Sequence, residues 1–246
     1  MRKFGLIGKK LGHSFSKKYF TEKFAREGIA DASYELYELP EAVMLKDLLQ
    51  QEPELVGLNV TVPYKEAVMP LLDELDEAAE KIGAVNTIRI NRGKTKGYNT
   101  DYIGFKATLE RFYPTAQRGK ALVLGTGGAA KAVQAALDAL GVPYAVVSRT
   151  PKQGELSYEQ LTPALVHEHN LIINTTPLGM SPAAETYPPL PYSSITKYHY
   201  SYDLVYNPEE TLFLRKSAAA GAKTINGMEM LCLQADEAWG IWNCEN

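Results

Sequence analysis

A glycine-rich loop between an apolar strand and an amphipathic helix restricts the fold of this chain more than any other feature. Ala121–Leu124 has the continuous apolar character of a buried strand, and Gly125–Gly128 follows it directly. Apolar side chains then recur at helical spacing, at Ala129, Val133, Leu137 and Leu140. A second strand is predicted at Tyr144–Ser148. Strand, glycine loop, helix and strand in this order are typical of a dinucleotide-binding unit with a parallel sheet.

Single positions in the loop fit this interpretation for physical reasons. Gly125 permits a tight turn, Gly127 lets the backbone approach a pyrophosphate, and Ala130 stands where a third glycine allows close helix–strand packing. The amides at the helix start provide the positive end of the helix dipole. Glycine clusters also occur in ordinary turns, so the prediction depends on the strands and helix around the loop.

The second strand indicates which dinucleotide binds. It ends at Ser148, 23 residues after Gly125, close to the offset of about 20 residues expected for the residue that contacts the ribose. An NAD site usually has an acidic residue there, whereas this chain has Ser148-Arg149-Thr150. A guanidinium can pair with the 2′-phosphate that a carboxylate would repel. The sequence therefore favours NADP(H); the alternative is that Arg149 is a solvated loop residue.

Strands and helices alternate along the rest of the chain, which predicts an α/β fold. Before the glycine loop, strands are expected at Lys3–Ile7, Tyr34–Leu39, Leu55–Val62 and Ala84–Ile90, and helices at Lys17–Glu27, Glu41–Gln51, Asp73–Lys81 and Asp101–Tyr113. After it, strands are expected at Leu171–Thr175, Ser201–Tyr206 and Lys223–Ile225, and helices at Glu209–Ala220 and Gly227–Trp242. The polar segment Thr115–Lys120 has the character of a linker, so we expect two domains.

The composition excludes several classes of protein. Of the 246 residues, 45% are hydrophobic and 22% charged, as in ordinary globular proteins. The net charge of −3 argues against nucleic acid as a partner. No apolar run approaches the ~18 residues of a membrane span, and the N-terminus lacks the apolar core of a signal peptide. Cys232 and Cys244 lack metal-ligand spacing, so we expect no metal, reduced thiols and a cytoplasmic protein.

A strand with polar residues on one face forms a second candidate site. Within Leu58–Val62 apolar residues alternate with Asn59 and Thr61, which predicts that both polar side chains point to the same face. Pro63 ends the strand because it has no amide hydrogen, and Lys65 follows. An amide, a hydroxyl and an ammonium group in one place suit a polyhydroxylated, negatively charged small molecule. The alternative is an edge strand whose polar face meets water.

These residues belong to a series of motifs that resembles shikimate dehydrogenases over essentially the whole chain. The first motifs are His13-Ser14-x-Ser16, Asn59-Val-Thr61-x-Pro63-x-Lys65, Gly83-Ala-Val-Asn86-Thr87 and Asn99-Thr-Asp101. After the glycine loop come Ser148-Arg149-Thr150, Ile173-Asn174-x-Thr176-x-x-Gly179-Met180, Tyr202-Asp203-x-x-Tyr206-x-Pro208, Gly227 and Gln234. Each motif alone is unspecific, since Asp101 at a helix start is also what an ordinary N-cap looks like. Their common order and spacing make the resemblance specific.

The resemblance implies an α/β protein with an N-terminal substrate domain and a Rossmann-type NADP-binding domain. The expected bounds are 1–101 with 226–246 for the first domain, because the C-terminal helix returns to it, and 102–225 for the second. The implied activity is the reversible, NADPH-dependent reduction of 3-dehydroshikimate to shikimate, a step toward the aromatic amino acids.

The resemblance also implies roles for single residues. Ser14 and Ser16 would hold the substrate carboxylate. The substrate ring would be surrounded by Asn59, Thr61, Lys65, Asn86, Asp101 and Gln234, with Tyr206 nearby. The cofactor would be lined by Gly125, Thr126, Gly127, Gly128, Ala129, Ser148, Arg149, Thr150, Leu204 and Gly227.

Carbonyl reduction suits these residue types independently of the resemblance. Hydride arriving at a carbonyl carbon leaves negative charge on the oxygen, so a proton donor must lie beside that oxygen. Lys65 can stabilise the alkoxide and supply the proton, with Asp101 orienting the ammonium group. Gln234 lies on the apolar stripe of the last predicted helix, where a polar side chain needs a partner, either the substrate or the backbone.

Some positions depart from the family pattern and leave alternatives open. Lys17 stands in place of a common proline, Tyr19-Phe20 of a frequent His-Asn pair, Ser148 of a common asparagine, and Gln153 of a residue that is often basic. One alternative is a quinate/shikimate dehydrogenase that accepts NAD, against which Arg149 and the serine pair count. Another is a catalytically silent NADP-sensing module, against which Lys65 and Asp101 count. We expect an enzyme acting on a small molecule, as a monomer or homodimer.

Overall fold

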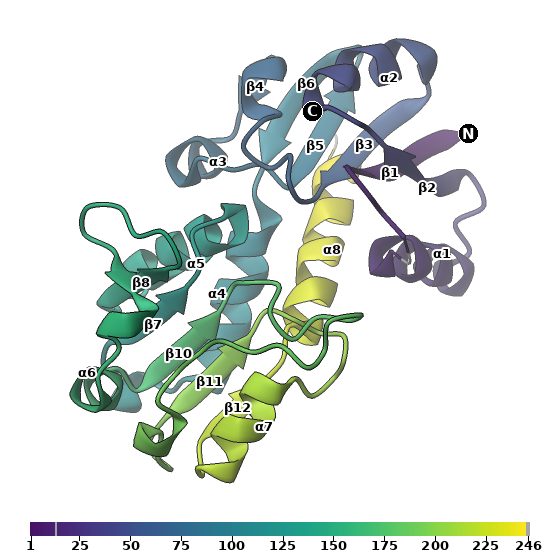
Figure 1. Cartoon of the computed structure of the whole chain (residues 1–246). Helices are drawn as coiled ribbons and strands as arrows, with labels where there is room; N and C mark the ends of the chain where they lie inside the picture. The colour runs from purple at the N-terminus through teal and green to yellow at the C-terminus, as the bar shows by residue number, and fades with distance from the viewer. Residues whose placement is uncertain (13, 245–246) are drawn as a thin grey trace. The chain divides into compact units, whose positions relative to one another are not determined.

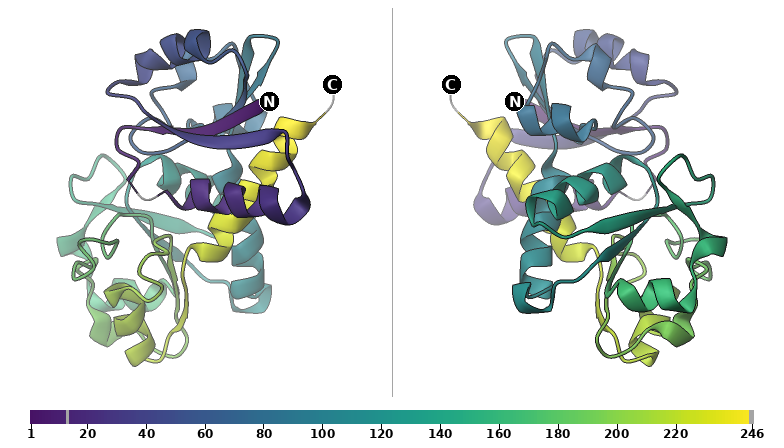
Figure 2. Two further views of the ribbon diagram at one scale, coloured as in Figure 1. Left: turned by 90° about the vertical axis from the view of Figure 1, so that its right-hand side faces the viewer. Right: turned by 90° about the vertical axis from the view of Figure 1, so that its left-hand side faces the viewer.

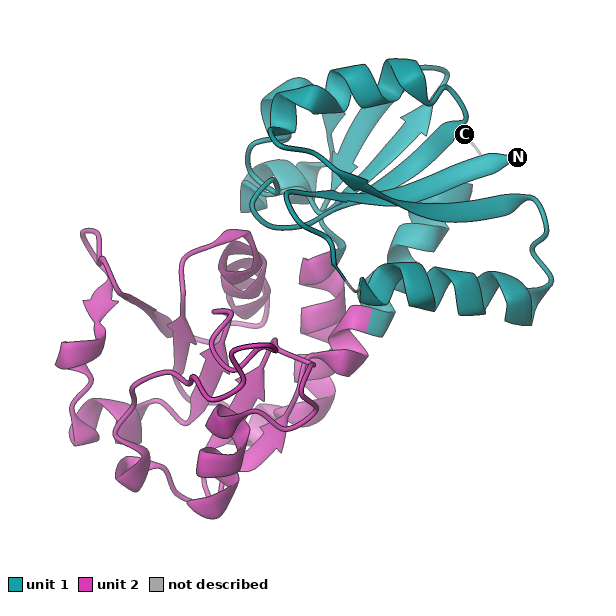
Figure 3. Cartoon of the chain, turned by 45° about the vertical axis from the view of Figure 1, so that its right-hand side comes forward, with its two compact units in different colours: residues 1–100, 232–246 teal, residues 101–231 magenta. Residues whose placement is uncertain are grey.

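Each of the two sheets of the chain belongs to its own compact unit (Figures 1 and 3). The first unit comprises Met1–Thr100 and Cys232–Asn246, and the second comprises Asp101–Leu231. The computed structural model describes residues 1–12 and 14–244. His13 of the first serine motif therefore lies outside the described residues.

A mixed sheet forms the framework of the first unit. Its strands are β1 (Arg2–Gly8), β2 (Ala32–Glu38), β3 (Leu55–Val60), β4 (Glu74–Leu75), β5 (Thr87–Asn91) and β6 (Lys94–Tyr98). Their spatial order is β2-β1-β3-β5-β6-β4, with β1 parallel to β2 and β3, and β5 antiparallel to β3 and β6. Arg92 and Gly93, with φ of 51° and 78°, join β5 to β6 in the two-residue turn that suits an antiparallel hairpin.

Helices cover both faces of this sheet (Figure 2). On one face, α1 (Phe15–Glu27) and α8 (Met228–Asn243) pack around an aromatic cluster. This cluster contains Phe4, Phe20, Phe24, Tyr34, Trp239 and Trp242. On the other face, α2 (Leu45–Gln51) and α3 (Glu77–Ile82) bury Leu45, Leu48 and Ala79 against the strands. Two 3₁₀ helices, Ala42–Met44 and Met69–Leu71, complete the cover.

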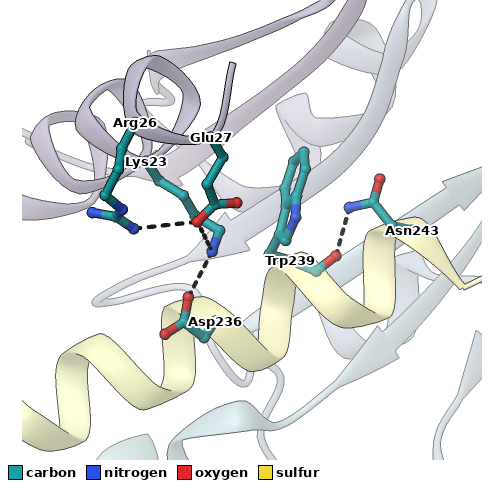
Figure 4. A network of polar contacts seen from close by, with 6 residues as sticks. All are labelled: Lys23, Arg26, Glu27, Asp236, Trp239 and Asn243. Atoms are coloured by element: carbon teal, nitrogen blue, oxygen red, sulfur yellow. Dashed lines mark hydrogen bonds and ion pairs between the residues drawn. The ribbon is translucent and has the colours of Figure 1, made fainter. Parts of the chain in front are cut away.

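An ion cluster around the buried Lys23 joins α1 to α8, with its other members exposed (Figure 4). The Lys23 ammonium lies 2.9 Å from Glu27 Oε1 and 3.0 Å from Asp236 Oδ1, and Arg26 also contacts Glu27. Burial lowers the pKa of Lys23, but the two carboxylates more than offset this, so that its pKa stands above the ordinary value. The cluster therefore fixes α1, which carries the serine motif, against the helix that carries Gln234.

The second unit contains a parallel sheet whose strand order reverses in its middle. Its strands are β7 (Ala121–Leu124), β8 (Tyr144–Ser148), β9 (Leu156–Ser157), β10 (Leu171–Asn174), β11 (Tyr200–Asp203) and β12 (Lys223–Ile225). The order is β12-β11-β10-β7-β8-β9, so the chain runs outward from β7 in one direction and from β10 in the other. Ligands of open α/β sheets bind at such a switch point, beyond the carboxyl ends of the strands.

The helices of the second unit lie on both faces of its sheet, as in a doubly wound fold. On one face, α4 (Thr100–Phe112) and α5 (Gly128–Ala139) pack on Val123 and Ile173. On the other, α6 (Pro163–Glu168) and α7 (Leu212–Ala219) pack on Leu122 and Ile172. The remaining turns are the 3₁₀ helices Thr115–Gln117, Tyr158–Gln160 and Tyr192–Ser194. Strands covered on both faces explain the continuous apolar runs in the sequence.

Some predicted elements have different ends in the structure, and the structure contains elements that were not predicted. The strand Leu55–Val62 ends at Val60, and the Val62 side chain is 72% exposed, so the alternation of apolar residues does not continue as a strand. The helix predicted from Asp73 begins only at Glu77, because Glu74–Leu75 form a strand that pairs with β6 and Asp76 caps the helix. The strand β6 and the helix α6 were not predicted.

Candidate active site

A continuous chain of hydrogen bonds joins polar side chains of the first unit. Its members, in order, are Ser16, Tyr34, Asn59, Thr87, Asn86, Thr100 and Gln234. The donor–acceptor distances are 2.7 Å from Tyr34 Oη to Asn59 Oδ1, 3.3 Å from Asn59 Nδ2 to Thr87 Oγ1, 3.2 Å from Thr87 Oγ1 to Asn86 Oδ1, 3.0 Å from Asn86 Nδ2 to Thr100 Oγ1, and 3.2 Å from Thr100 Oγ1 to Gln234 Oε1. This hydrogen-bonded chain links α1, β2, β3 and β5 to α8 and to Thr100, the first residue of α4.

Two asparagines act in both senses in this hydrogen-bonded chain. Asn59 and Asn86 each accept at Oδ1 and donate from Nδ2. The Thr100 hydroxyl lies 3.2 Å from Gln234 Oε1 and 3.3 Å from Asn86 Oδ1, so it has two acceptors within reach. The backbone amide of Thr100 also donates to Asn86 Oδ1 at 2.7 Å, which fixes the orientation of that amide. Since all members except Ser16 are buried, each needs a partner, and the arrangement supplies one.

The hydrogen-bonded chain contains predicted site residues and also residues that were not predicted from the sequence. Ser16, Asn59, Asn86 and Gln234 were predicted on the basis of motifs, whereas Tyr34, Thr87 and Thr100 were not. Thr87 and Thr100 each adjoin a predicted residue, and that adjacency was the available signal. Tyr34 gave none, because a tyrosine in an alternating strand is equally typical of ordinary core packing.

The other predicted residues of the first unit lie at the ends of its elements. Ser14 caps α1, accepting from the backbone amide of Lys17 at 3.4 Å. Thr61 follows β3, and its amide donates to Ile7 O at 3.0 Å. The half-buried Lys65 lies in the next turn, where its carbonyl oxygen accepts from the Val85 amide at 2.7 Å. That bond places the Lys65 backbone one residue away from Asn86 in the neighbouring segment.

Two predicted substrate or catalytic residues belong to the second unit. Asp101 is buried in the first turn of α4, directly after Thr100 of the hydrogen-bonded chain. Tyr206 lies beyond β11 and is half-buried, and burial raises the pKa of its hydroxyl. The Tyr206 side chain is therefore neutral at physiological pH and can both donate and accept a hydrogen bond.

The glycine loop lies at the switch point of the second sheet. Gly125 has φ of 117°, and a Cβ there would lie 2.6 Å from Thr175 Oγ1, so no other residue fits. Thr175 itself donates from its backbone amide and its hydroxyl to Leu124 O. Gly127 precedes α5 with open space around its Cα, and no side chain in the described part of the molecule caps this helix. The loop thus fits an anionic group at the helix start.

The segment after β8 matches the requirements of a 2′-phosphate site. Ser148 is buried and accepts from the Thr150 amide at 3.2 Å, which forms the turn. Arg149 and Thr150 are exposed beyond the strand. The positive charge of Arg149 acts on the half-buried Tyr158, where it opposes the rise in pKa that burial causes. The residues present therefore fit NADP(H) in charge as well as in position.

Leu204 and Gly227 adjoin one another in the second unit. Any side chain at Gly227 would overlap the carbonyl oxygen of Leu204, and the Gly227 amide donates to Val205 O at 3.2 Å. The two residues that the resemblance implied as cofactor contacts thus form one surface beyond the end of β11.

Comparisons with known proteins agree with these features. Residues 6–88 match the family model of the shikimate dehydrogenase substrate binding domain. A shikimate dehydrogenase (NADP(+)) of Clostridium perfringens is 39% identical, with 99% of this chain and 93% of that protein covered. The chain belongs to the shikimate dehydrogenase family.

Solved structures of the family have the same fold. A shikimate 5-dehydrogenase of Thermus thermophilus, solved with NADP(H) and shikimate, is 32% identical with a TM-score of 0.87, covering 99% of this chain and 94% of that one. A quinate dehydrogenase of Corynebacterium glutamicum, solved with NAD, is 30% identical with a TM-score of 0.87, covering 98% and 93%. The predicted α/β fold, with its C-terminal helix returning to the first domain, is confirmed. Among the described residues, no helix is both long and apolar enough to cross a bilayer.

Two departures from the family pattern have structural explanations. Lys17, in place of a proline, forms an ion pair with Glu35 of β2 at 2.7 Å. Phe20 is fully buried and stacks on the Tyr34 ring at a centroid distance of 4.6 Å. Both contacts lie between α1, which carries the serine pair, and β2.

Asp203, at the end of β11, predicts a specific pH dependence of stability. Burial raises the pKa of its carboxyl from 3.8 to about 6, although hydrogen bonds from Thr211, the Val205 amide and Asn174 oppose the shift. Between these two values the folded state holds a proton that the unfolded state has lost, so stability falls as the pH rises from about 4 to 6. The loss amounts to roughly 3 kcal/mol.

Urea unfolding of the wild type and of Asp203→Asn, from pH 4 to pH 7, measures this contribution. The asparagine cannot ionise, yet it keeps an oxygen for Asn174 and for the Val205 amide. We expect the wild type to lose stability relative to the variant across this interval. Parallel curves would mean that Asp203 titrates as an ordinary carboxyl.

Proposed function

We propose that this chain catalyses the reversible, NADPH-dependent reduction of 3-dehydroshikimate to shikimate in aromatic amino-acid biosynthesis. The observation that supports this most is the hydrogen-bonded chain from Ser16 to Gln234, in the unit whose sequence matches a shikimate-binding domain. A row of oriented amides and hydroxyls is suited to a ring that carries several hydroxyl groups. In this proposal residues 1–101 and 226–246 bind the substrate, and residues 102–225 bind NADP(H).

The proposed roles follow from the chemistry of each side chain. Ser14 and Ser16, at the start of α1, hold the substrate carboxylate, since hydroxyls donate well to a charged acceptor. The ring hydroxyls and the carbonyl lie among Asn59, Thr61, Asn86 and Gln234, with Tyr206 as a further neutral donor. NADPH, when bound, supplies the hydride. Lys65 gives its proton to the carbonyl oxygen and stabilises the negative charge there, and Asp101 orients the Lys65 ammonium group.

The proposed cofactor site consists of the glycine loop and the segment after β8. The amides of Gly125–Ala129 bind the pyrophosphate, and Ser148, Arg149 and Thr150 bind the 2′-phosphate of the adenosine ribose. Leu204 and Gly227 would line the cofactor beyond the end of β11. The proposal further includes a cytoplasmic location, in keeping with Cys232 and Cys244, which form no disulfide in the described structure, and a monomer or homodimer as the working form.

An assay of shikimate oxidation with NADP⁺ and with NAD⁺ tests the substrate, the cofactor and catalytic competence together. The proposal expects NADPH formation from shikimate, much slower reaction with NAD⁺, and little activity on quinate. Preference for NAD⁺, or for quinate, would favour the quinate/shikimate dehydrogenase alternative, to which the similarity with the Corynebacterium enzyme also points. Binding of NADPH without any turnover would identify a sensing module instead.

A further inference from the structure

Tyr34 of β2 is buried, with one polar atom in an otherwise apolar setting. Its side chain is 3% exposed, and its ring lies parallel to that of Phe20 in the aromatic cluster between α1, α8 and the sheet. For packing alone, a phenylalanine would serve equally well. A buried hydroxyl without a hydrogen-bond partner would destabilise the fold. The reason for a tyrosine at this position therefore lies in the partners of its hydroxyl.

The Tyr34 hydroxyl contacts two predicted substrate-binding residues. It donates to Asn59 Oδ1 at 2.7 Å, and the Ser16 side chain interacts with it and opposes the rise in its pKa. Burial raises the pKa of Tyr34, so that the hydroxyl keeps its proton and stays a donor at physiological pH. With Tyr34 donating, Asn59 presents its oxygen to Tyr34 and its nitrogen to Thr87 and Asn86 O.

We propose that Tyr34 is a positioning residue of the substrate site, whose hydroxyl orients Ser16 and Asn59 together. This inference deepens the proposed function and rests on it. Tyr34 holds the Ser16 side chain in place before the substrate arrives, and the charged carboxylate then accepts a hydrogen bond from Ser16 after the hydroxyl rotates. The benefit is pre-organisation, because the substrate does not have to order these side chains when it binds.

The test is Tyr34→Phe, which keeps the ring stacked on Phe20 and removes only the oxygen. Calorimetric titration with shikimate requires no turnover, so it tests this inference even if the assay above finds no reaction. We expect the Kd for shikimate to rise about fivefold to tenfold, the effect of losing one buried hydrogen bond. The KM for shikimate should follow, with kcat changed less than about threefold and the Kd for NADP⁺ unchanged.

Tyr202→Phe is a matched control. Tyr202 is fully buried in the second unit, and its hydroxyl shares a 2.7 Å hydrogen bond with Thr108 Oγ1. Both variants lose a buried hydrogen bond and should melt at similarly lowered temperatures, but Tyr202→Phe should leave shikimate affinity unchanged. Equal shikimate affinities in the two variants would overturn the proposal.

A double-mutant cycle with Ser16→Ala tests whether Tyr34 acts through its neighbours. If Tyr34 orients Ser16, the effect of Tyr34→Phe on shikimate affinity should shrink clearly when Ser16 is already alanine. Effects that simply add would overturn the proposal as well, since they would mean that Tyr34 affects binding by some general change of the fold.

Discussion

Replacing Lys65 with alanine should lower kcat by about 10²–10⁴, while shikimate binding weakens only modestly. The proposed role of Lys65 is exercised mainly in the transition state, where negative charge develops on the substrate oxygen and a proton must reach it. Its backbone is fixed by the hydrogen bond from Val85, the residue before Asn86 of the hydrogen-bonded chain. Steady-state kinetics in both directions, with a separate titration of shikimate affinity, measure the two effects independently.

Lys46→Ala is the matched control for this prediction. Lys46 is exposed on α2 of the same unit, and we expect its replacement to leave kcat unchanged. Nearly normal turnover in Lys65→Ala would exclude Lys65 as the proton donor. A large loss of affinity with unchanged kcat would instead assign it to substrate binding.

Replacing Arg149 with alanine should weaken NADPH binding by about tenfold to a hundredfold and change NADH binding little. The two cofactors differ only in the 2′-phosphate, and charge-assisted hydrogen bonds to such a group contribute about 1.5–3 kcal/mol. Arg149 is exposed directly after β8, so its removal should leave the packing of the strand unchanged. Fluorescence titration of each reduced cofactor measures both affinities.

Arg215→Ala controls for the loss of a positive charge from the second unit. Its side chain is 62% exposed on α7 and pairs with Glu210, away from the predicted phosphate contacts. Equal weakening of NADPH and NADH by Arg149→Ala would mean that the arginine does not read the phosphate. Thr150, the other exposed residue of the predicted phosphate contacts, would then be the next to test.

The two units differ in how far the sequence predicted them. Ala121–Leu124, Tyr144–Ser148 and Lys223–Ile225 were predicted with the bounds that the structure has. Two of these, β7 and β8, flank the glycine loop, where a covered parallel strand leaves a clear signal. In the first unit β6 was missed, since its sequence Lys94–Tyr98 is polar and its pairing with β5 depends on a turn of Arg92 and Gly93.

By itself, the sequence determined the family, the doubly wound second unit and the types of residue available for the chemistry, because motifs at fixed spacing and apolar periodicity are local properties. Only the tertiary structure decided that Ser16, Asn59, Asn86 and Gln234 are connected, and that Tyr34, Thr87 and Thr100 connect them. These hydrogen-bonded residues come from strands and helices that are far apart in the sequence, from residue 16 to residue 234. Hydrogen bonds between them form only after the sheet has been assembled and its helices have closed over it, so no local pattern records them.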